Sequence, residues 1–236
     1  MTVSEKLLGR LHVAAVIAAG GSSRRFGDDK LFAEILGVPV LARTIEAFER
    51  APLIREIVVV AREESAGAVR ELIARYGFKK CAAVVTGGDT RAESVRNGVL
   101  AVSKKARLIA IHDGARPCVT QEVIRKTIML ARRRYAAAPA VRAKSTFKMA
   151  SAGVVTETLN RKTLYEIQTP QVFDADLIRG AYIKLPQNSS ATDDLSVVEL
   201  MGVTAYLSRG EYTNIKITTP EDIKTAEAFA REPERG

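Results

Sequence analysis

The chain of 236 residues has no tryptophan, two cysteines and two histidines, and these scarcities exclude several kinds of site. Cys81 and Cys118 have neither CxxC spacing nor a neighbouring histidine, which excludes a disulfide framework and the usual zinc sites. The two histidines, His12 and His112, are too few for a histidine-based metal centre. We therefore expect two reduced, mostly buried thiols. His112, next to Asp113, is either functional or a positioned structural imidazole.

Long apolar runs are also absent. None approaches the roughly 20 residues needed to cross a bilayer, and residues 1–10 lack the apolar core of a secretory signal. Apolar residues make up 47% of the chain and charged residues 27%, the balance of a globular protein. We expect a single domain spanning residues 1–236, located in the cytoplasm and without a membrane partner.

The formal net charge of +9 raises the question of a nucleic-acid partner. The basic residues are spread along the chain, and clusters such as Arg132-Arg133-Arg134 are typical of the solvated face of a helix. Basic residues interleaved with aromatics, which mark many nucleic-acid-binding modules, are missing. A positive field that attracts small anionic substrates fits equally well. We expect no nucleic-acid partner, and a non-catalytic nucleotide-binding or nucleic-acid-binding module remains a distant alternative.

The most informative stretch is residues 14–30. A short apolar run ends in Gly20-Gly21-Ser22-Ser23, and basic residues follow up to Lys30. A buried strand that opens into a small-residue loop brings backbone N–H groups together, and with nearby cations it favours a polyphosphate. The loop is not a P-loop, because no Gly-Lys-Ser/Thr closes it, and it lacks the later glycines of the dinucleotide fingerprint. The loop alone does not identify the nucleotide.

Strands and helices alternate in the first half of the chain. Apolar runs at 14–19, 57–60, 82–85 and 108–111 predict buried strands, and helical spacing is found within 31–50, 63–76, 91–103 and 121–135. This rhythm predicts an α/β, Rossmann-like fold with a mostly parallel twisted sheet flanked by helices. Polar segments at Gly20, Gly87 and Asp113 all follow strands, so we expect them to meet at one edge of the sheet.

The rhythm changes after residue 135. Pro139 is expected to end the preceding helix, and two runs around a turn at 151–153 predict a β-hairpin. We expect this hairpin to form an inserted arm at roughly 140–164 that reaches a second subunit. Helices are expected at 174–184, 193–201 and 220–230, with Asp174 and Thr192 as N-caps, and strands at 203–207 and 214–218.

Several segments together resemble the 2-C-methyl-D-erythritol 4-phosphate cytidylyltransferase family. They are Ala18-Ala19-Gly20 with Arg24 and Lys30, Gly87-Gly88 with Arg91 and Ser94, His112-Asp113-Gly114-Ala115-Arg116-Pro117, Thr169-Pro170-Gln171, Thr192-Asp193-Asp194, and Asn214-Ile215-Lys216 with Pro220-Glu221-Asp222. The segments occur in order across almost the whole chain. The first is shared by nucleotidyltransferases in general, but the combined set is specific.

The resemblance implies transfer of CMP from CTP to a sugar-alcohol phosphate with release of pyrophosphate. Arg24 and Lys30 would stabilise the transition state, with Arg25 as the alternative to Arg24. The expected CTP-binding residues are Ala18, Ala19, Gly20, Gly21, Ser22, Gly87, Gly88 and Ser94. Mg²⁺ would be held mainly by the CTP phosphates, and no protein ligand is assigned to it. The acceptor phosphate is already anionic at neutral pH, so no general base is needed.

The resemblance also implies an acceptor site and a homodimer. Asp113 and Arg116 would lie near the acceptor, whose phosphate would meet Arg161 and Lys216, with Thr146 and Thr169 as hydrogen-bonding partners. Thr146 and Arg161 would come from the partner subunit. The family motif on the arm usually reads Asp-Thr, whereas this chain has Ser145-Thr146. Ribitol 5-phosphate is the alternative acceptor, because a sister family shares the nucleotide half.

Overall fold

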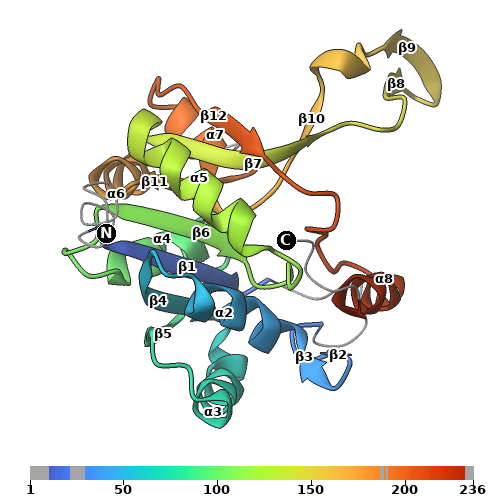
Figure 1. The fold of residues 1–236 in the computed structure, drawn as a ribbon. Coiled ribbons are helices and arrows are strands. Elements are labelled where there is room, and N and C mark those ends of the chain that lie inside the picture. The colour runs from blue at the N-terminus through green and yellow to red at the C-terminus, as the bar shows by residue number, and fades with distance from the viewer. Residues whose placement is uncertain (1–10, 22–29, 187–188, 190, 232–236) are drawn as a thin grey trace, which may run out of the picture.

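The computed structural model describes residues 11–21, 30–186, 189 and 191–231 (Figure 1). Its strands are β1 (Val13–Ala19), β2 (Glu34–Ile35), β3 (Val38–Pro39), β4 (Ile54–Ala61), β5 (Cys81–Thr86), β6 (Leu108–Asp113), β7 (Ala136–Arg142), β8 (Lys148–Ser151), β9 (Val154–Thr158), β10 (Tyr165–Ile167), β11 (Gln171–Asp174) and β12 (Tyr206–Arg209). Its α-helices are α2 (Val40–Arg50), α3 (Ala66–Tyr76), α4 (Arg91–Ala101), α5 (Gln121–Arg134), α6 (Ala175–Lys184), α7 (Asp194–Glu199) and α8 (Pro220–Arg231), and short 3-10 turns occupy Glu63–Ser65 and Arg161–Thr163.

The main sheet is mostly parallel. Its strands follow the order β10-β7-β11-β6-β1-β4-β5, and β12 pairs with β7. Strands β1, β4, β5 and β6 run parallel to one another, whereas β11 is antiparallel to β6 and β7, and β10 is antiparallel to β7. The predicted α/β, Rossmann-like architecture is confirmed, with antiparallel strands added on one side.

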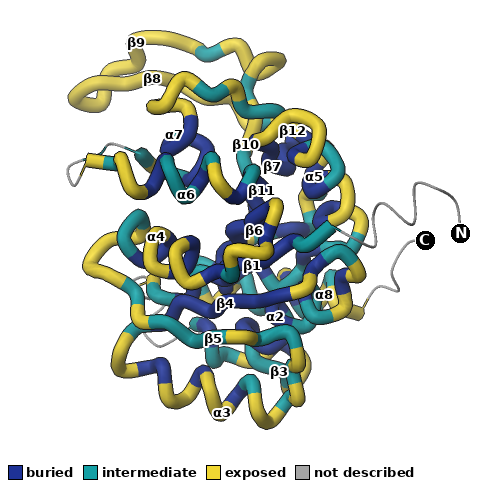
Figure 2. The backbone as a smooth tube through the Cα atoms, turned by 90° about the vertical axis from the view of Figure 1, so that its left-hand side faces the viewer, coloured by how far each residue is buried: buried dark blue, intermediate teal, exposed yellow. Residues whose placement is uncertain are grey.

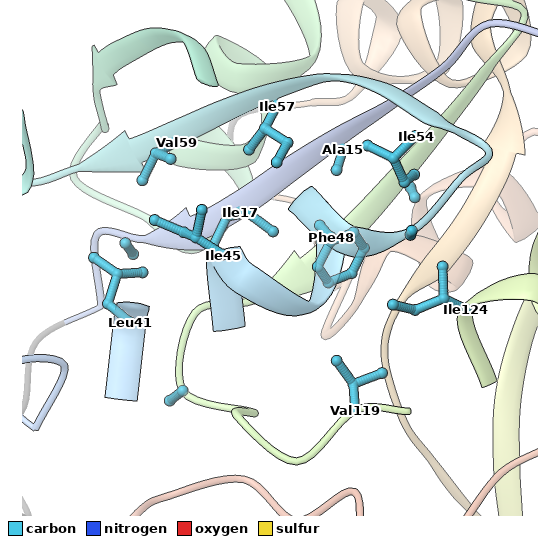
Figure 3. Packing of buried hydrophobic residues seen from close by; sticks show 14 of the residues in the cluster. Ala15, Ile17, Leu41, Ile45, Phe48, Ile54, Ile57, Val59, Val119 and Ile124 are labelled. Carbon is cyan, nitrogen blue, oxygen red and sulfur yellow. The ribbon is translucent and has the colours of Figure 1, made fainter. Parts of the chain in front are cut away.

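Helices cover both faces of this sheet, because the buried strands are apolar on both sides. In β1, Val13, Ala15, Ile17 and Ala19 face one layer, while Ala14 and Val16 face the other. The first layer is filled by α2, α3, α5 and α8, and Figure 3 shows Leu41, Ile45 and Phe48 of α2 packed against Ile17 and its neighbours. The second layer is filled by α4, α6 and α7.

Several local predictions hold because single residues determine where helices begin and end. Gly77 ends α3 in the left-handed conformation with φ of 65°, which glycine adopts without strain. Asp174 caps α6 by accepting hydrogen bonds from the backbone N–H groups of Asp176 and Leu177. For α7, however, the cap is Asp193, which accepts from the backbone of Ser196, and the prediction of Thr192 was wrong.

The prediction that Pro139 ends the preceding helix was wrong. Helix α5 ends at Arg134, and Ala136–Arg142 forms β7, a buried strand with neighbours on both sides. Ala137 pairs with Val172 of β11 on one side and with Tyr206 of β12 on the other. The backbone oxygen of Pro139 accepts a hydrogen bond from the N–H of Gln168, so the proline contributes to the ladder as an acceptor.

Strands β10 and β11 pair with the same edge of β7, one after the other along its length, and residues 168–170 separate them. Strand β12 occupies the opposite edge of β7. Ala140, Val141 and Arg142 pair with β10, and Ala136 and Ala137 pair with β11. The intervening Gln168 and Thr169 are buried. Gln168 still donates to Pro139 of β7, and the strand breaks after it, where Thr169 contacts Asp113 at the end of β6. This break in the strand brings Thr169 to the edge of the sheet where the polar loops meet.

The predicted hairpin is present and projects from the body of the molecule (Figure 1). Strands β8 and β9 pair around Ala152 and Gly153, both with positive φ, as a tight hairpin turn requires. Figure 2 shows the hairpin exposed along its length, and β8 and β9 have no buried residue. Within the described ranges, no helix combines the length and apolar character of a membrane span.

Candidate active site

The carboxyl ends of β1, β5 and β6 meet at one edge of the sheet, as predicted, and the end of β4 lies between those of β1 and β5. The backbone N–H of Gly87, after β5, donates to the oxygen of Ala61 at the end of β4, at 2.8 Å. The N–H of Gly114, after β6, donates to the oxygen of Ala18 in β1, at 2.9 Å. Ala18, Ala19 and Gly20 therefore lie between the loops that follow β5 and β6.

Ser94 connects the loop after β5 to helix α4. Its buried hydroxyl accepts a hydrogen bond from the N–H of Gly88 at 3.1 Å and lies 3.2 Å from the oxygen of the same residue. A Cβ atom at Gly87 would lie 2.6 Å from Ser94 Oγ, and one at Gly20 would lie 3.4 Å from it. Glycine is thus required at position 87 for close packing, and the structure brings Gly20, Gly87, Gly88 and Ser94 together.

The loop after β1 is described only at its two ends. Gly21 is exposed and Lys30 is half-buried. Ser22, Arg24 and the alternative Arg25 lie outside the described residues. Lys30 directly precedes Leu31, whose backbone oxygen accepts a hydrogen bond from Leu41 at the start of α2.

Asp113, the last residue of β6, is surrounded by cationic side chains. Its Oδ2 lies 2.9 Å from Lys216 Nζ and 3.4 Å from Arg116 Nε, and its Oδ1 lies 3.8 Å from Arg91 Nη2. Burial alone would raise the pKa of this carboxyl group, but Lys216, Arg91 and Arg116 together lower it well below its usual range. These three cations therefore favour the ionised form of Asp113.

His112 has a positioning role behind this carboxylate. Its fully buried ring lies 2.8 Å from Thr169 Oγ1 through Nδ1 and 3.2 Å from the backbone oxygen of Arg116 through Nε2. Burial lowers the pKa of His112 to about 4, so the ring is neutral at pH 7. A carbonyl oxygen only accepts, so Nε2 carries the proton and Nδ1 accepts from the Thr169 hydroxyl.

Thr169 in turn accepts a hydrogen bond from the backbone N–H of Asp113 at 3.2 Å. A series of hydrogen bonds from Arg116 through His112 and Thr169 to Asp113 thus fixes the end of β6. The ring of Phe48 in α2 packs on His112 with centroids 4.8 Å apart, which connects this hydrogen-bond network to the hydrophobic core. Of the two interpretations of His112, the structural imidazole is the one that the geometry supports.

Lys216 comes from residues 214–218, which were predicted as a strand and do not form one. Their hydrogen bonds go to turns: Ile217 N–H donates to Ala115 O, and Arg116 Nη1 donates to Asn214 O at 2.7 Å. Asn214 is fully buried, and its Nδ2 donates to Thr169 O. The segment is held against the loop after β6, which places Lys216 beside Asp113.

At the edge of the sheet, the predicted site residues within the described ranges thus form two groups, the glycine loops with Ser94 and the residues around Asp113. We use the name Asp113 cluster for His112, Asp113, Arg116, Thr169 and Lys216 together with Arg91. Sequence reasoning gave no role to Arg91 or to its partner Asp194, although both stand in the quoted motifs. Nothing in the local sequence connects these two residues, which are 103 positions apart.

Thr146 and Arg161 lie on the exposed arm, outside the Asp113 cluster. Arg161 Nη1 donates to the backbone oxygen of Lys144 at 3.2 Å, which holds the two sides of the arm together. Figure 1 shows the arm extending away from the edge of the sheet where the loops of β1, β5 and β6 meet. One chain by itself therefore does not bring Thr146 and Arg161 to the other acceptor-binding candidates.

The chain matches the 2-C-methyl-D-erythritol 4-phosphate cytidylyltransferase family over residues 13–232. Proteins of that name from Alkaliphilus oremlandii and Caldanaerobacter subterraneus subsp. tengcongensis are 39% and 42% identical to it over 94% of the chain, which covers 97% and 100% of their lengths.

Solved structures agree with this match. The crystal structure of 4-diphosphocytidyl-2C-methyl-D-erythritol synthase from Anaerococcus prevotii superposes with a TM-score of 0.83 at 33% identity, covering 94% of this chain and 100% of that one. The 2-C-methyl-D-erythritol 4-phosphate cytidylyltransferase from Thermus thermophilus has a TM-score of 0.75 at 28% identity, with coverages of 93% and 98%.

Proposed function

The chain belongs to the 2-C-methyl-D-erythritol 4-phosphate cytidylyltransferase family and therefore transfers CMP from CTP to 2-C-methyl-D-erythritol 4-phosphate, a step of non-mevalonate isoprenoid synthesis. We propose that the Asp113 cluster binds this acceptor. The observation that carries the proposal is the charge balance of the cluster and the adjoining Asp194. Arg91, Arg116 and Lys216 meet two carboxylates, those of Asp113 and Asp194. One positive charge is left over at the edge of the sheet, where an anionic phosphate would be attracted.

Lys216 is the residue of the cluster best suited to contact the acceptor phosphate. Its side chain is 40% exposed although its ammonium group is paired with Asp113, so the group faces both the carboxylate and the open edge. Arg116, by contrast, is buried and donates to the backbone of Asn214. We assign Arg116 to holding the Lys216 segment, and Lys216 to contacting the phosphate as a point charge.

The CTP phosphates and base are assigned to the neighbouring glycine loops. Backbone N–H groups around Gly20, Gly21 and Ser22 would bind the triphosphate. Gly87, Gly88 and Ser94 would line the base and ribose pocket. The hydrogen bonds between Ser94 and Gly88 support this grouping, because they fix the loop against the start of α4. Both substrates would then meet at the ends of the adjacent strands β1 and β6.

The chemistry requires charge stabilisation more than proton transfer. An oxygen of the acceptor phosphate attacks the α-phosphorus of CTP, and the bond from that phosphorus to the bridging oxygen breaks to release pyrophosphate. Arg24 and Lys30 are assigned to the negative charge that develops on the α-phosphate and the leaving group. The acceptor phosphate is a nucleophile without deprotonation, consistent with a His112 that is occupied in hydrogen bonds to Thr169 and Arg116.

Mg²⁺ is proposed to bind mainly through the CTP phosphates, where it would neutralise part of their charge. The described residues contain no group of three or more His, Cys, Asp or Glu side chains placed to hold a metal ion. Asp113, the carboxylate closest to the reaction, is already neutralised by Lys216, Arg116 and Arg91. A metal ion that arrives with the nucleotide would act beside Lys30 and the Gly20 loop, where it would offset phosphate charge.

We further propose that the arm pairs with a second copy of this chain in the cytoplasm. Phe147, Met149, Val154 and Val155 of the arm are 47–67% exposed, and an isolated two-stranded hairpin is only marginally stable in water. A partner that covers these side chains would bring Thr146 and Arg161 of one chain to the Asp113 cluster of the other. The exposure of both residues within one chain is consistent with this arrangement.

The first test is pyrophosphate release from CTP and Mg²⁺, with 2-C-methyl-D-erythritol 4-phosphate and ribitol 5-phosphate assayed side by side. Release with the first acceptor alone is the expected result. Release with ribitol 5-phosphate alone would move the acceptor assignment to the sister family. A folded protein that binds CTP but is inactive with both acceptors would overturn the assignment of the reaction.

A further inference from the structure

Asp194, the first residue of α7, is a completely buried carboxylate. Both of its oxygens accept hydrogen bonds from Arg91: Nη1 to Oδ1 at 2.9 Å and Nη2 to Oδ2 at 2.8 Å. The hydroxyl of Tyr182 in α6 donates to Oδ1 at 2.5 Å. A buried carboxylate is costly unless it is paired and hydrogen-bonded, and these three bonds satisfy it.

The ion pair between Arg91 and Asp194 connects elements of the proposed CTP site with elements of the proposed acceptor site. Arg91 begins α4, the helix that carries Ser94 and follows the Gly87-Gly88 loop. Asp194 follows its helix cap Asp193, whose Oδ2 accepts from Gln171 Nε2 at 2.9 Å. Gln171 is two residues after Thr169, a member of the Asp113 cluster. Helix α7 is therefore bonded both to the nucleotide side and to the acceptor side of the edge.

Stability alone does not account for such a pair. Well-packed apolar residues of similar volume often match or exceed the stability that a buried ion pair provides. What the pair does provide is geometry, because two parallel N–H···O bonds fix the plane of the guanidinium group. With that plane fixed by Asp194, Nη2 of Arg91 lies 3.8 Å from Oδ1 of Asp113, and 37% of the Arg91 side chain remains exposed.

The neighbouring carboxylates keep the Arg91 guanidinium group protonated in this arrangement. Burial lowers the pKa of Arg91, but Asp194 and Asp113 outweigh that effect and raise the pKa above its usual value. Burial together with Asp194 raises the pKa of Tyr182, which therefore remains a neutral donor. Between the two carboxylates, Arg91 is a permanent cation held mainly by Asp194 and directed toward Asp113.

We propose that Asp194 is a positioning residue for nucleotidyl transfer: by holding Arg91 in one orientation, it sets the place of the Asp113 carboxylate and hence of Lys216 relative to α4. This rests on the proposed function, in which Lys216 contacts the acceptor phosphate. Without Asp194, Arg91 would turn to pair fully with Asp113 and would compete with Lys216 for the same carboxylate. The acceptor phosphate would then lose its point of attachment.

The test is steady-state kinetics of the full-length chain carrying Asp194→Asn, with kcat and the KM of each substrate measured separately. We expect kcat/KM for 2-C-methyl-D-erythritol 4-phosphate to fall by about 10–100-fold, the effect of a small misplacement in an active site. The KM for CTP should change by less than about threefold, because the interaction lost acts on the acceptor side. Asp176→Asn is the matched control, since Asp176 is an exposed aspartate that pairs with Arg179 at 3.6 Å.

A second variant separates geometry from charge and serves if Asp194→Asn folds poorly. Arg91→Lys keeps every charge but cannot form the two parallel bonds to Asp194. Positioning predicts that Arg91→Lys reproduces the acceptor-specific defect of Asp194→Asn. In the double variant the two effects should not add, because both disrupt the same contact.

Three results would overturn the proposal. If folded Asp194→Asn and Arg91→Lys both keep wild-type kinetics, the pair is only structural. Equal losses for CTP and acceptor would indicate general damage to the fold. A wild-type chain inactive with 2-C-methyl-D-erythritol 4-phosphate would overturn the proposed function and this proposal with it, whereas an active wild type with unchanged variants would overturn the positioning role alone.

Discussion

Lys216 Nζ lies 2.9 Å from Oδ2 of Asp113, although Lys216 belongs to the irregular segment 214–218 and Asp113 ends a strand about one hundred positions earlier in the chain. Asp113 is 8% exposed as a residue, whereas the Lys216 side chain is 40% exposed. The carboxylate is therefore the fixed member of the pair, and it holds the more accessible ammonium group at the edge of the sheet. In the proposed site, this single carboxylate holds a flexible lysine in place for contact with the acceptor phosphate.

Replacing Asp113 by asparagine should damage catalysis by releasing Lys216. The amide is similar in size but carries no charge, so Lys216 and Arg116 would lose their shared anion. We expect kcat/KM for the acceptor to fall about 100-fold, as when a reacting group is displaced by about 1 Å. Steady-state kinetics check this, with Glu122→Gln as control, because Glu122 also pairs with two cations but does so on the exposed face of α5. Unchanged acceptor kinetics in Asp113→Asn would contradict the role of the pair.

The buried His112 predicts a pH dependence of stability. Its pKa is about 4 when folded and about 6.5 when unfolded, so the unfolded chain binds the extra proton between these values. The free energy of unfolding should therefore decrease as the pH falls from 6.5 to 4, by up to about 3 kcal/mol. Asp113, with a lowered folded pKa, loses its contribution only below its unfolded pKa of about 4, which keeps the two windows apart.

The measurement is denaturant unfolding at several pH values for the wild type and for His112→Gln. The difference between the two slopes in the pH 4–6.5 window is the contribution of His112. Identical slopes for the two proteins would mean that the imidazole titrates normally in the folded state, in disagreement with its burial.

Lys30→Ala tests the assignment of the catalytic cation. Removing a charge that stabilises only the transition state should lower kcat about 100-fold or more and leave the affinity for CTP within a few-fold. Single-turnover assays and CTP titration separate the two quantities. Lys105→Ala removes an exposed lysine elsewhere and should change neither of them. Near-normal turnover in Lys30→Ala would show that the assignment is wrong.

Mixed dimers test whether the arm serves the partner's site. Arg161→Ala should mainly raise the acceptor KM, and Lys30→Ala should lower kcat. If Arg161 acts across the dimer, mixing the two variant chains restores about a quarter of the wild-type activity, because random pairing makes half of the dimers mixed and each mixed dimer has one intact site. If Arg161 acts within its own chain, no intact site can form, and at acceptor concentrations well below the raised KM the mixture is no more active than the two variants assayed separately.

Gly98 in α4 predicts a packing effect on the same helix that carries Arg91 and Ser94. A Cβ atom there would lie 2.5 Å from a methyl carbon of Val16 and 2.5 Å from one of Val60. Gly98→Ala should lower the stability by about 1–3 kcal/mol through overpacking. Gly67→Ala in α3 is the matched control, because a Cβ at Gly67 meets nothing within 4 Å, and it should be neutral or stabilising. Thermal unfolding of both variants compares them.

The sequence predicted those parts of the fold that depend on local chemistry. Runs such as Ile57-Val58-Val59-Val60 are apolar and β-branched, so they form buried strands wherever the sheet places them. Strand β7 escaped prediction because its core is Ala136-Ala137-Ala138-Pro139, residues that are poor strand formers in isolation. Its pairing with β11 and β12 outweighs that preference.

The positions of the site loops could be predicted because the ends of the strands could be predicted. Once the strands are placed, Gly20, Gly87 and Asp113 must lie at one edge, and the structure confirms this. Which side chains bond to one another was not predictable, because contacts such as Arg91 with Asp194 join distant segments. The apolar alternation at 214–218 predicted a strand, yet its hydrogen bonds go to turns such as the one containing Ala115.

Arg142 pairs with Tyr165 at the point where the arm leaves and rejoins the sheet, so the arm is an insertion between two neighbouring strand ends. Its two ends are antiparallel neighbours, and such neighbours can be joined by a connection of two residues. Residues 143–164 can therefore vary in length and sequence among proteins of this architecture without disturbing the order of the sheet. In the homodimer proposed above, the arm that joins the two copies can therefore change while the strands that carry the glycine loops keep their places.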